Sequence, residues 1–257
     1  AVANIKLAAV ITRRLSTPPH RKRSPLHAQS SRPSSNQPHL HPKLAATVRR
    51  HLGARSRKPV APHNVAACKV LLAELAARPR PLVLDSFCGT GHSTAALARR
   101  HPGHLVVGID KSGHRLDRHP ADPAGHYLLL RAECEDLWRL LVEEGVGVDH
   151  HYLLYPNPWP KAKHLQRRVH GGAGFYWLLQ LAAGRRPGAG APSRIELRSN
   201  WQTYVEEFGV AMHLAGFPGS VARVPPGPAD LSLFEQKYRA SGHELWSYTG
   251  RASPAAP

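Results

Sequence analysis

The 257-residue chain has few acidic side chains, 17 against 35 lysines and arginines, and its formal net charge is therefore +18. None of these acids precedes Glu74, although fourteen basic residues do. Such a balance favours an anionic polymer or surface as the partner. Organellar transit peptides and basic arms are also rich in Lys and Arg. Only part of the charge therefore belongs to a folded domain.

Cysteine is equally scarce, and its three copies are isolated from one another: Cys68, Cys88 and Cys134. The absence of a C-x-x-C pair argues against a disulfide framework or a cysteine zinc site, and it fits a reducing compartment. The close histidine pairs, His39 with His41 and His150 with His151, lack the helical spacing to carboxylates that metal sites use. The sequence predicts no metal site, and no apolar run approaches the ~20 residues that span a membrane.

Composition divides the chain into four parts. Residues 1–33 are rich in Arg, Ser, Pro and His and lack acids, which predicts a basic extension that is disordered or acts as a transit peptide. Residues 34–80 are expected to form a helical segment, 81–250 the main domain and 251–257 a flexible tail. We expect a cytoplasmic protein, or a chloroplast or mitochondrial one if the extension is a transit peptide.

Apolar periodicity predicts alternating elements from residue 44 onward. Helices are expected from Leu44 to Leu52, with Gly53 as the stop, and after Pro62 until Pro79 and Pro81. Strands are then expected at 82–85, 105–110, 127–131, 151–155 and 194–197, and helices at 92–100, 112–118, 135–144, 175–182 and 201–214. Late antiparallel strands are expected near Phe234 and Leu245. This alternation indicates an α/β fold, a mostly parallel sheet with helices on both faces.

Polar groups follow three of the expected strands. Asp85 is followed by Gly89-Thr90-Gly91, Asp110 ends the second strand, and Glu133 follows the third. Ligands of open parallel sheets bind beyond these strand ends, where glycine allows close backbone approach and a carboxylate can accept both ribose hydroxyls. Thr94 stands where a dinucleotide fingerprint has its third glycine. A smaller adenosine-bearing ligand is therefore favoured.

These groups resemble the cofactor motifs of S-adenosylmethionine-dependent methyltransferases, in which an acid and G-x-G follow the first strand and an acid ends the second. The resemblance implies S-adenosylmethionine as cofactor. It also implies that five residues contact it: Asp85, Gly89, Gly91, Asp110 and Glu133.

A proline-rich segment follows the fourth expected strand. The apolar run from Tyr152 to Tyr155 stops at Pro156-Asn157-Pro158-Trp159-Pro160, which can neither continue a sheet nor form a helix interior. Basic residues come next: Lys161, Lys163, His164, Arg167 and Arg168. A rigid loop with an amide, an indole and neighbouring cations suits a flat base attached to a polyanion.

This segment resembles the P-D-P-W/H signature of the tRNA (guanine-N7)-methyltransferase family, and it implies a Rossmann-like, doubly wound, seven-stranded sheet. Asn157 stands where the family has Asp. A second departure is Asn200, where the family has the Asp of a Thr-Asp pair. The family's T-x-F-E motif is present as Ser232-Leu233-Phe234-Glu235. Two losses of a carboxylate suggest a divergent branch.

The resemblance implies transfer of a methyl group to guanine N7 in tRNA, with Asn157 and Asn200 at the reacting centre. It further implies a set of substrate-binding residues: Trp159, Lys161, Lys163, His164, Arg167, Arg168, Asn200, Ser232 and Glu235. N7 is already a lone-pair nucleophile, so catalysis would consist mostly of orientation. Cations beside the loop would pair with tRNA phosphates.

Alternatives remain open from the residues alone. Asn200 would also suit a helix N-cap, and Glu235 an exposed charge. N-P-P-[YFW] loops grip amino groups, so methylation of adenine N6 or glutamine N5 is a second hypothesis, although Asn157 is followed by only one Pro. A third is a catalytically weak RNA-binding homologue that depends on a partner. We expect a monomer or weak homo-oligomer.

Overall fold

The computed structural model describes residues 30–55, 58–120, 125–184, 193–227 and 230–252. Within these ranges, seven strands form one sheet in the order β3-β2-β1-β4-β5-β7-β6. The strands are β1 (Leu82–Ser86), β2 (Leu105–Asp110), β3 (Tyr127–Arg131), β4 (His150–Leu154), β5 (Arg194–Ser199), β6 (Gly219–Arg223) and β7 (Trp246–Gly250). The first five are parallel, and β7 runs antiparallel to β5 and β6.

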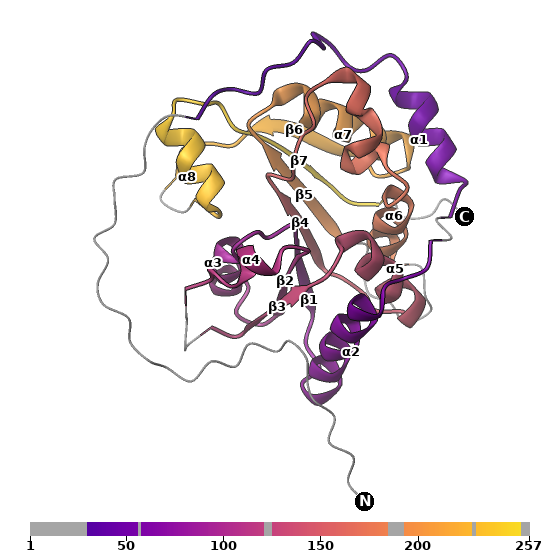
Figure 1. Cartoon of the computed structure of the whole chain (residues 1–257), viewed down its shortest axis with the longest axis vertical. Coiled ribbons are helices and arrows are strands. Elements are labelled where there is room, and N and C mark those ends of the chain that lie inside the picture. The colour runs from indigo at the N-terminus through magenta and orange to yellow at the C-terminus, as the bar shows by residue number, and fades with distance from the viewer. Residues whose placement is uncertain (1–29, 56–57, 121–124, 185–192, 228–229, 253–257) are drawn as a thin grey trace, which may run out of the picture.

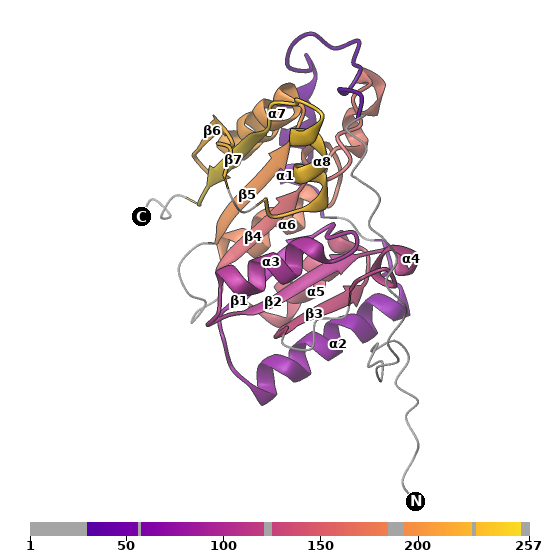
Figure 2. The same ribbon diagram turned by 90° about the vertical axis from the view of Figure 1, so that its left-hand side faces the viewer.

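Helices cover both faces of this sheet (Figures 1 and 2). On one side lie α1 (Leu44–Leu52), α2 (Pro62–Ala77), α5 (Cys134–Glu144), α6 (Phe175–Ala183) and α7 (Gln202–Leu214). On the other lie α3 (His92–Arg100), α4 (Gly113–Leu116) and α8 (Leu233–Ala240). Two short 3₁₀ helices, η1 (Ala162–Arg167) and η2 (Val169–Gly171), follow the proline-rich loop.

The strands divide their side chains between two cores, as expected for a sheet buried on both faces. Leu82, Leu84 and Val107 pack in the larger core with α2, α5, α6 and α7. Val83 and Val106 point the other way, toward α3 and α8. The parallel strand register therefore fixes which loops emerge together at each edge of the sheet.

Most expected elements are confirmed, and several to the residue: α3, β2 and β3 span the predicted ranges. Ser112 caps α4 by accepting a hydrogen bond from the Arg115 amide, but the helix ends at Leu116 rather than 118. The strand expected near Phe234 is wrong, because Phe234 lies in α8. Strand β6 was not predicted.

The predicted basic extension lies outside the described residues up to position 29, and the tail does so from 253. Residues 30–41, here called the strap, run from the α8 side of the molecule to α1 (Figure 1). The strap bonds to three separate places: the Ser30 amide to Ser241, the Ser35 hydroxyl to the Pro160 carbonyl, and the His41 amide to Glu207.

The three cysteines are buried and unpaired. Among the described residues, no helix is both long and apolar enough to cross a membrane.

Candidate active site

Two loops at the carboxyl edge of the sheet lie next to each other because β1 and β4 are paired parallel neighbours, with Ser86 opposite Leu153. One contains the glycine turn and the other the proline-rich segment. Within the described residues, positive φ at a residue other than glycine occurs only at Phe87 (64°), Tyr155 (55°) and Trp159 (47°). All three lie in these two loops. Such strain concentrates where a structure positions a ligand.

The glycine turn is built for close backbone approach. Gly89 and Gly91 have φ of 63° and 76°, which side-chain-bearing residues rarely adopt. A Cβ on Gly91 would stand 2.7 Å from the Leu129 side chain, whereas one on Gly89 would meet nothing within 4 Å. Gly91 therefore packs tightly against β3, and the space beside Gly89 is left open.

Asp85 is the penultimate residue of β1 and is completely buried. Its Oδ2 accepts hydrogen bonds from the hydroxyls of Ser93 (2.6 Å) and Thr94 (2.7 Å), which fixes the first turn of α3. Its Oδ1 is buried without a partner. Burial raises the pKa of Asp85 to about 6, although the bonds from Ser93 and Thr94 oppose the shift.

Asp110 at the end of β2 organises the same turn. Its Oδ2 accepts the Gly89 amide at 3.0 Å, and its Oδ1 accepts the Ser112 amide at 2.8 Å. Arg115 pairs with Oδ1 at 3.1 Å. A ribose reaching this carboxylate would displace the half-exposed Arg115 while the two backbone bonds remain.

Glu133 lies at the N-terminus of α5 and is half-exposed. Its carboxylate contacts His63 at 2.8 Å, and its amide donates to Asn64 Oδ1 at 3.1 Å. The Asn64 amide group donates to Asp136 at 2.7 Å, so this buried residue joins α2 to α5. His63 and Asn64 were missed from sequence. The signal that could have found them is Asn64 itself, a polar residue among the apolar residues of the expected helix after Pro62.

These residues fit an adenosine-bearing cofactor. The open space beside Gly89, the unpaired Asp85 oxygen and the carboxylates of Asp110 and Glu133 follow three neighbouring strands at one edge. Backbone and carboxylate groups here match ribose hydroxyls and an adenine edge in kind.

The proline-rich loop presents Asn157 to solvent, while Pro156 is buried. Asn157 Oδ1 accepts the Trp159 amide at 3.2 Å, a turn in which the side chain caps its own backbone. The Trp159 indole is covered by Arg167, whose guanidinium lies 4.8 Å from the ring centroid, and by the edge of His164 at 5.5 Å. Trp159 is thereby held in a fixed orientation beside Asn157.

The basic residues after the loop divide into two groups. Lys161, Lys163 and Arg167 are exposed, as a role in phosphate binding requires. Arg168 is completely buried, so the predicted phosphate contact of Arg168 is wrong. Its guanidinium pairs with Glu207, donates to the Trp159 carbonyl at 3.3 Å and lies 5.0 Å from the Trp201 ring centroid. Arg168 supports the loop from behind.

Glu207 in α7 is the buried counterpart of Arg168. It also accepts bonds from Gln37 (2.6 Å) and the His41 amide (2.7 Å) of the strap, and it contacts His170. Burial opposes its ionisation, but His170 and Arg168 lower the pKa of Glu207 to about 2. The pair is therefore charged and fully hydrogen-bonded, the condition under which a buried ion pair is tolerated.

Asn200 follows β5 and donates its side-chain Nδ2 toward His243 Nδ1 at 3.0 Å. His243 Nε2 lies 2.7 Å from the Ser30 carbonyl, which can only accept. The Nε2 proton therefore fixes the tautomer, Nδ1 accepts from Asn200, and Asn200 Oδ1 remains an acceptor. Asn200 is not a helix cap, since Trp201 holds that position in α7.

Ser232 and Glu235 are buried and form the start of α8, where they bond to neighbouring protein groups, and their contact with the base or the cofactor stays a prediction. The Ser232 hydroxyl accepts the Glu235 amide at 3.1 Å, and Glu235 accepts the Leu231 amide and pairs with Arg198 at 2.7 Å. This is a variant of the capping box in which the Glu side chain accepts the amide of the residue before the N-cap. The alternative of an exposed charge at Glu235 is wrong.

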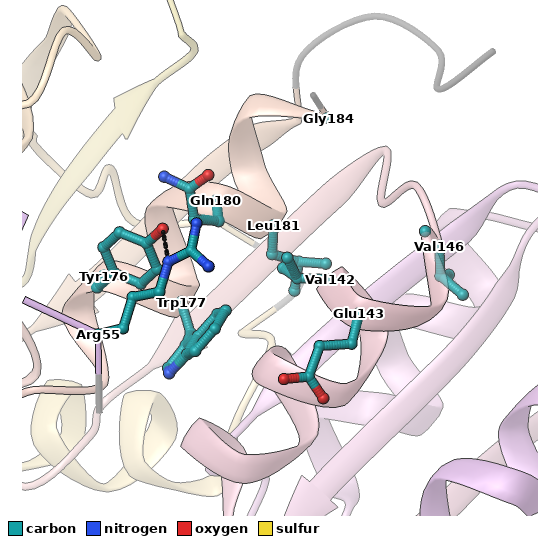
Figure 3. A pocket seen from close by; sticks show the side chains of 10 residues that line it. Arg55, Val142, Glu143, Val146, Tyr176, Trp177, Gln180, Leu181 and Gly184 are labelled. Atoms are coloured by element: carbon teal, nitrogen blue, oxygen red, sulfur yellow. Dashed lines mark hydrogen bonds between the residues drawn. The ribbon is translucent and has the colours of Figure 1, made fainter. Parts of the chain in front are cut away.

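A cavity of about 300 Å³ lies elsewhere, against the C-terminal end of α5 and along one side of α6 as far as its C-terminal end (Figure 3). Arg55 crosses it and donates to the Tyr176 hydroxyl at 2.9 Å. These helix ends precede β4 and β5, so the cavity belongs to the opposite edge of the sheet from the glycine turn.

Comparison with known proteins agrees with this site. Residues 79–174 match a family model described as "Putative methyltransferase". The tRNA (guanine-N(7)-)-methyltransferase of Sodalis glossinidius is 30% identical over 184 residues, covering 68% of this chain and 74% of that protein. The enzyme of the same name from Nitrosospira multiformis is 28% identical, with coverage of 72% and 80%.

Among solved structures, the 16S rRNA methyltransferase KamB superposes with a TM-score of 0.53 at 22% identity, covering 77% of this chain and 96% of that chain. This likeness supports the Rossmann-like fold alone. The segment that matches the family model, residues 79–174, includes the glycine turn and the proline-rich loop. The cofactor of the chain is S-adenosylmethionine. The chain is a methyltransferase and belongs, as a divergent branch, to the tRNA (guanine-N7)-methyltransferase family.

Proposed function

We propose that the chain transfers a methyl group from S-adenosylmethionine to N7 of a guanine in tRNA. The observation that carries this proposal is the position of Asn157, which is exposed in the loop after β4, the strand that pairs with β1 and its glycine turn. The names of the relatives support the choice of substrate.

The two asparagines present opposite hydrogen-bonding groups. The Asn157 oxygen is taken by the Trp159 amide, which leaves its NH₂ group to donate. The Asn200 NH₂ is taken by His243, which leaves its oxygen to accept. They follow the neighbouring strands β4 and β5, joined by the bond from the Tyr155 amide to the Arg198 carbonyl. One donor and one acceptor match guanine, whose O6 accepts and whose N1–H and NH₂ donate.

Adenine presents the reverse order on this edge, with a donor at N6 and an acceptor at N1. A fixed donor at position 157 and a fixed acceptor at position 200 therefore favour guanine. Polar groups that would be left unpaired by the wrong base discriminate strongly.

The chemistry asks these residues to orient the base. The bound cofactor supplies an electrophilic methyl group on its sulfonium. Guanine N7 has a lone pair and no proton to remove, so no general base is required. Trp159, held in place by Arg167 and His164, is an aromatic ring against which the base can stack on the face that Arg167 leaves free. The amides at 157 and 200 lack the charge of a carboxylate, so they offset the developing ring charge only as dipoles.

Exposed cations beside the loop supply the electrostatic part of tRNA binding. Lys161 lies immediately before η1, and Lys163 lies on it. Arg49 and Arg50 are exposed on α1, which packs against the adjoining η2. Phosphate contacts of this kind weaken with salt.

The test is nucleoside mass spectrometry of tRNA incubated with the full chain and S-adenosylmethionine. We expect 7-methylguanosine as the product. Methyl on an exocyclic nitrogen would favour an amino-group methyltransferase instead. Cofactor binding without methylation of any tRNA would contradict the proposal and favour an RNA-binding homologue, which Asn157→Asp would then activate.

A further inference from the structure

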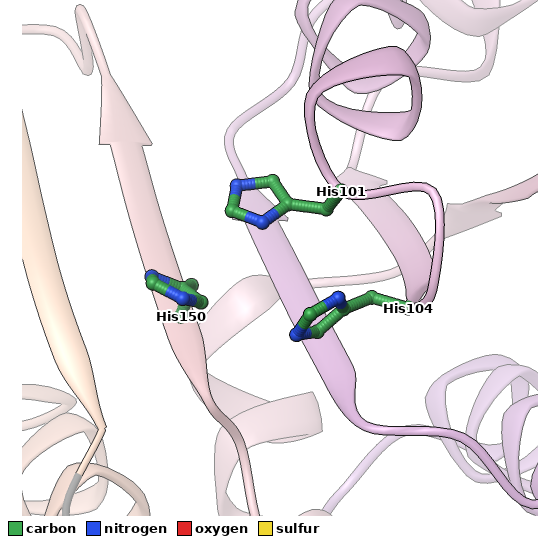
Figure 4. Close-up of side chains that lie close together, drawn as sticks. All are labelled: His101, His104 and His150. Carbon is green, nitrogen blue, oxygen red and sulfur yellow. The ribbon is translucent and has the colours of Figure 1, made fainter.

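Three histidines converge at the amino edge of the sheet, opposite the active site (Figure 4). His101 follows α3, His104 ends the next turn immediately before β2, and His150 is the first residue of β4. The strand β1 lies between β2 and β4, and Val83 of β1 pairs with both Val106 and His150. The fold therefore brings together side chains nearly fifty positions apart.

Their geometry suits metal ligation. One ring nitrogen from each histidine lies within 4.8 Å of those of the other two. Zinc held by imidazoles at 2.0–2.1 Å requires nitrogens about 3.3 Å apart. Side-chain rotations that close the gap by roughly 1.5 Å suffice, and His101 and His104 belong to a turn rather than a strand interior.

The cluster also contains ring nitrogens that have no hydrogen-bond partner in the protein. Nδ1 of His104 and Nδ1 of His150 are both buried without a hydrogen-bond partner. Buried polar atoms are normally paired, and each exception calls for an explanation such as an ion.

Polar groups that can bond to the far side of the histidine rings are present as well. The Asp149 carboxylate lies 3.5 Å from His104 Nε2, so it can accept the Nε2 proton, and the unpaired Nδ1 of the same ring then keeps its lone pair. The Tyr152 hydroxyl lies 3.0 Å from a ring nitrogen of His101. A carboxylate behind a ligating imidazole orients the ring and raises its basicity. Three cations oppose a dication, Arg100 near His101 and Arg194 and Arg251 near His150, whereas Glu196 near His101 and Asp149 near His150 favour one.

We propose that His101, His104 and His150 bind a divalent transition metal of the imidazole-preferring class, such as Zn²⁺, with solvent completing the coordination. The site would join the α3–β2 turn to the start of β4 and stabilise the fold without touching the reacting groups. The prediction of no metal from sequence considered only histidines close in the chain, which hides a cluster assembled across β1.

The test is titration of the metal-free full chain with Zn²⁺ by calorimetry and with Co²⁺ by visible absorption. We expect one high-affinity ion per chain and a rise in Tm of about 5 °C at a hundredfold excess of Zn²⁺ over Kd. In His104→Gln and His101→Gln the affinity should fall at least about tenfold, because a tridentate site loses one ligand.

His213→Gln, on an exposed position of α7, is the matched control and should bind as the wild type does. Thermal melting in EDTA shows whether each variant is folded. His104→Gln and His101→Gln each test a different metal ligand of the same site. Absence of binding by the wild type, or binding unchanged in both His104→Gln and His101→Gln, would overturn the proposal.

Discussion

The cofactor half and the substrate half of the carboxyl edge are held in place by different parts of the chain. In the cofactor half, the contacts that shape the glycine turn are short in sequence: Asp85 bonds to Ser93 and Thr94, and Asp110 bonds to Gly89. Glu133 is the exception, since it is held by His63 and Asn64 of α2. In the substrate half, the supporting contacts join residues far apart in the sequence. The proline-rich loop depends on the strap residue Ser35, 125 positions away, and on Arg168 paired with Glu207.

This difference implies that the two halves can be damaged separately. A local turn with its own carboxylates should bind the cofactor whether or not the strap and α7 are intact. The loop that presents Asn157 should lose its geometry when remote supports are removed, with cofactor binding retained. Each prediction below damages one half and names the measurement that reports the damage.

The largest effect is expected from Arg168→Met, which leaves the Glu207 carboxylate buried without its cation. Removal of one partner of a buried ion pair costs about 3–5 kcal/mol. Urea denaturation should show that loss in the free energy of unfolding, and methylation should fall with it. The double variant Arg168→Met/Glu207→Gln should recover part of the stability. A single variant as stable as the wild type would exclude a buried pair.

Gly91→Ala should damage the cofactor half. The residue has φ of 76°, and a Cβ would stand 2.7 Å from Leu129. Backbone strain and the clash together should weaken S-adenosylmethionine binding at least about tenfold, equivalent to ~1.4 kcal/mol. Calorimetry with the cofactor measures this, and tRNA affinity should not change. Gly53→Ala, where nothing lies within 4 Å and φ is negative, is the control. Equal cofactor affinity in the two variants would refute the role of the turn.

His243→Phe should damage the substrate half alone. It keeps a ring to stack on Tyr238 but removes the acceptor that orients Asn200 and the bond to Ser30. Loss of these bonds should lower kcat for tRNA about tenfold, at ~1.4 kcal/mol. Cofactor affinity should remain unchanged, and His213→Phe should behave as the wild type. A kcat equal to that of the control would show that Asn200 needs no such partner.

The smallest effect is expected from Lys161→Ala/Lys163→Ala, two exposed cations beside the loop. Their loss should weaken tRNA binding a few-fold at low salt and reduce the slope of log K against log salt by about 2. Filter binding over a salt series measures the slope. Lys69→Ala, exposed on α2, provides the comparison. An unchanged slope would remove these lysines from the interface.

The same division explains what the sequence could predict. Strands such as Leu105–Asp110 and the glycine turn are specified by nearby residues, so their positions were predicted correctly. Phe234 was grouped with the alternating residues near Leu245 as a late strand, whereas Ser232 caps a helix that begins at Leu233 and contains Phe234. Strand β6 is exposed along its whole length and has no apolar alternation to reveal it.

Long-range contacts explain the remaining errors. Arg168 stands in a run of cations, and nothing local distinguishes it from exposed Arg167; only Glu207, 39 positions later, makes it a buried residue. The polarity of Asn200 depends likewise on His243 and on the Ser30 carbonyl. The imidazoles of His101, His104 and His150 meet only through the strand order.

The most direct test of the account measures cofactor affinity and N7 methylation of tRNA together in the wild type, Gly91→Ala and Asn157→Ala. We expect Gly91→Ala to lower both the cofactor affinity and the rate of methylation. Asn157→Ala should keep the cofactor affinity within about twofold, while methylation falls at least about tenfold. Wild-type methylation by Asn157→Ala, or loss of its cofactor affinity, would contradict a site divided between the glycine turn and the proline-rich loop.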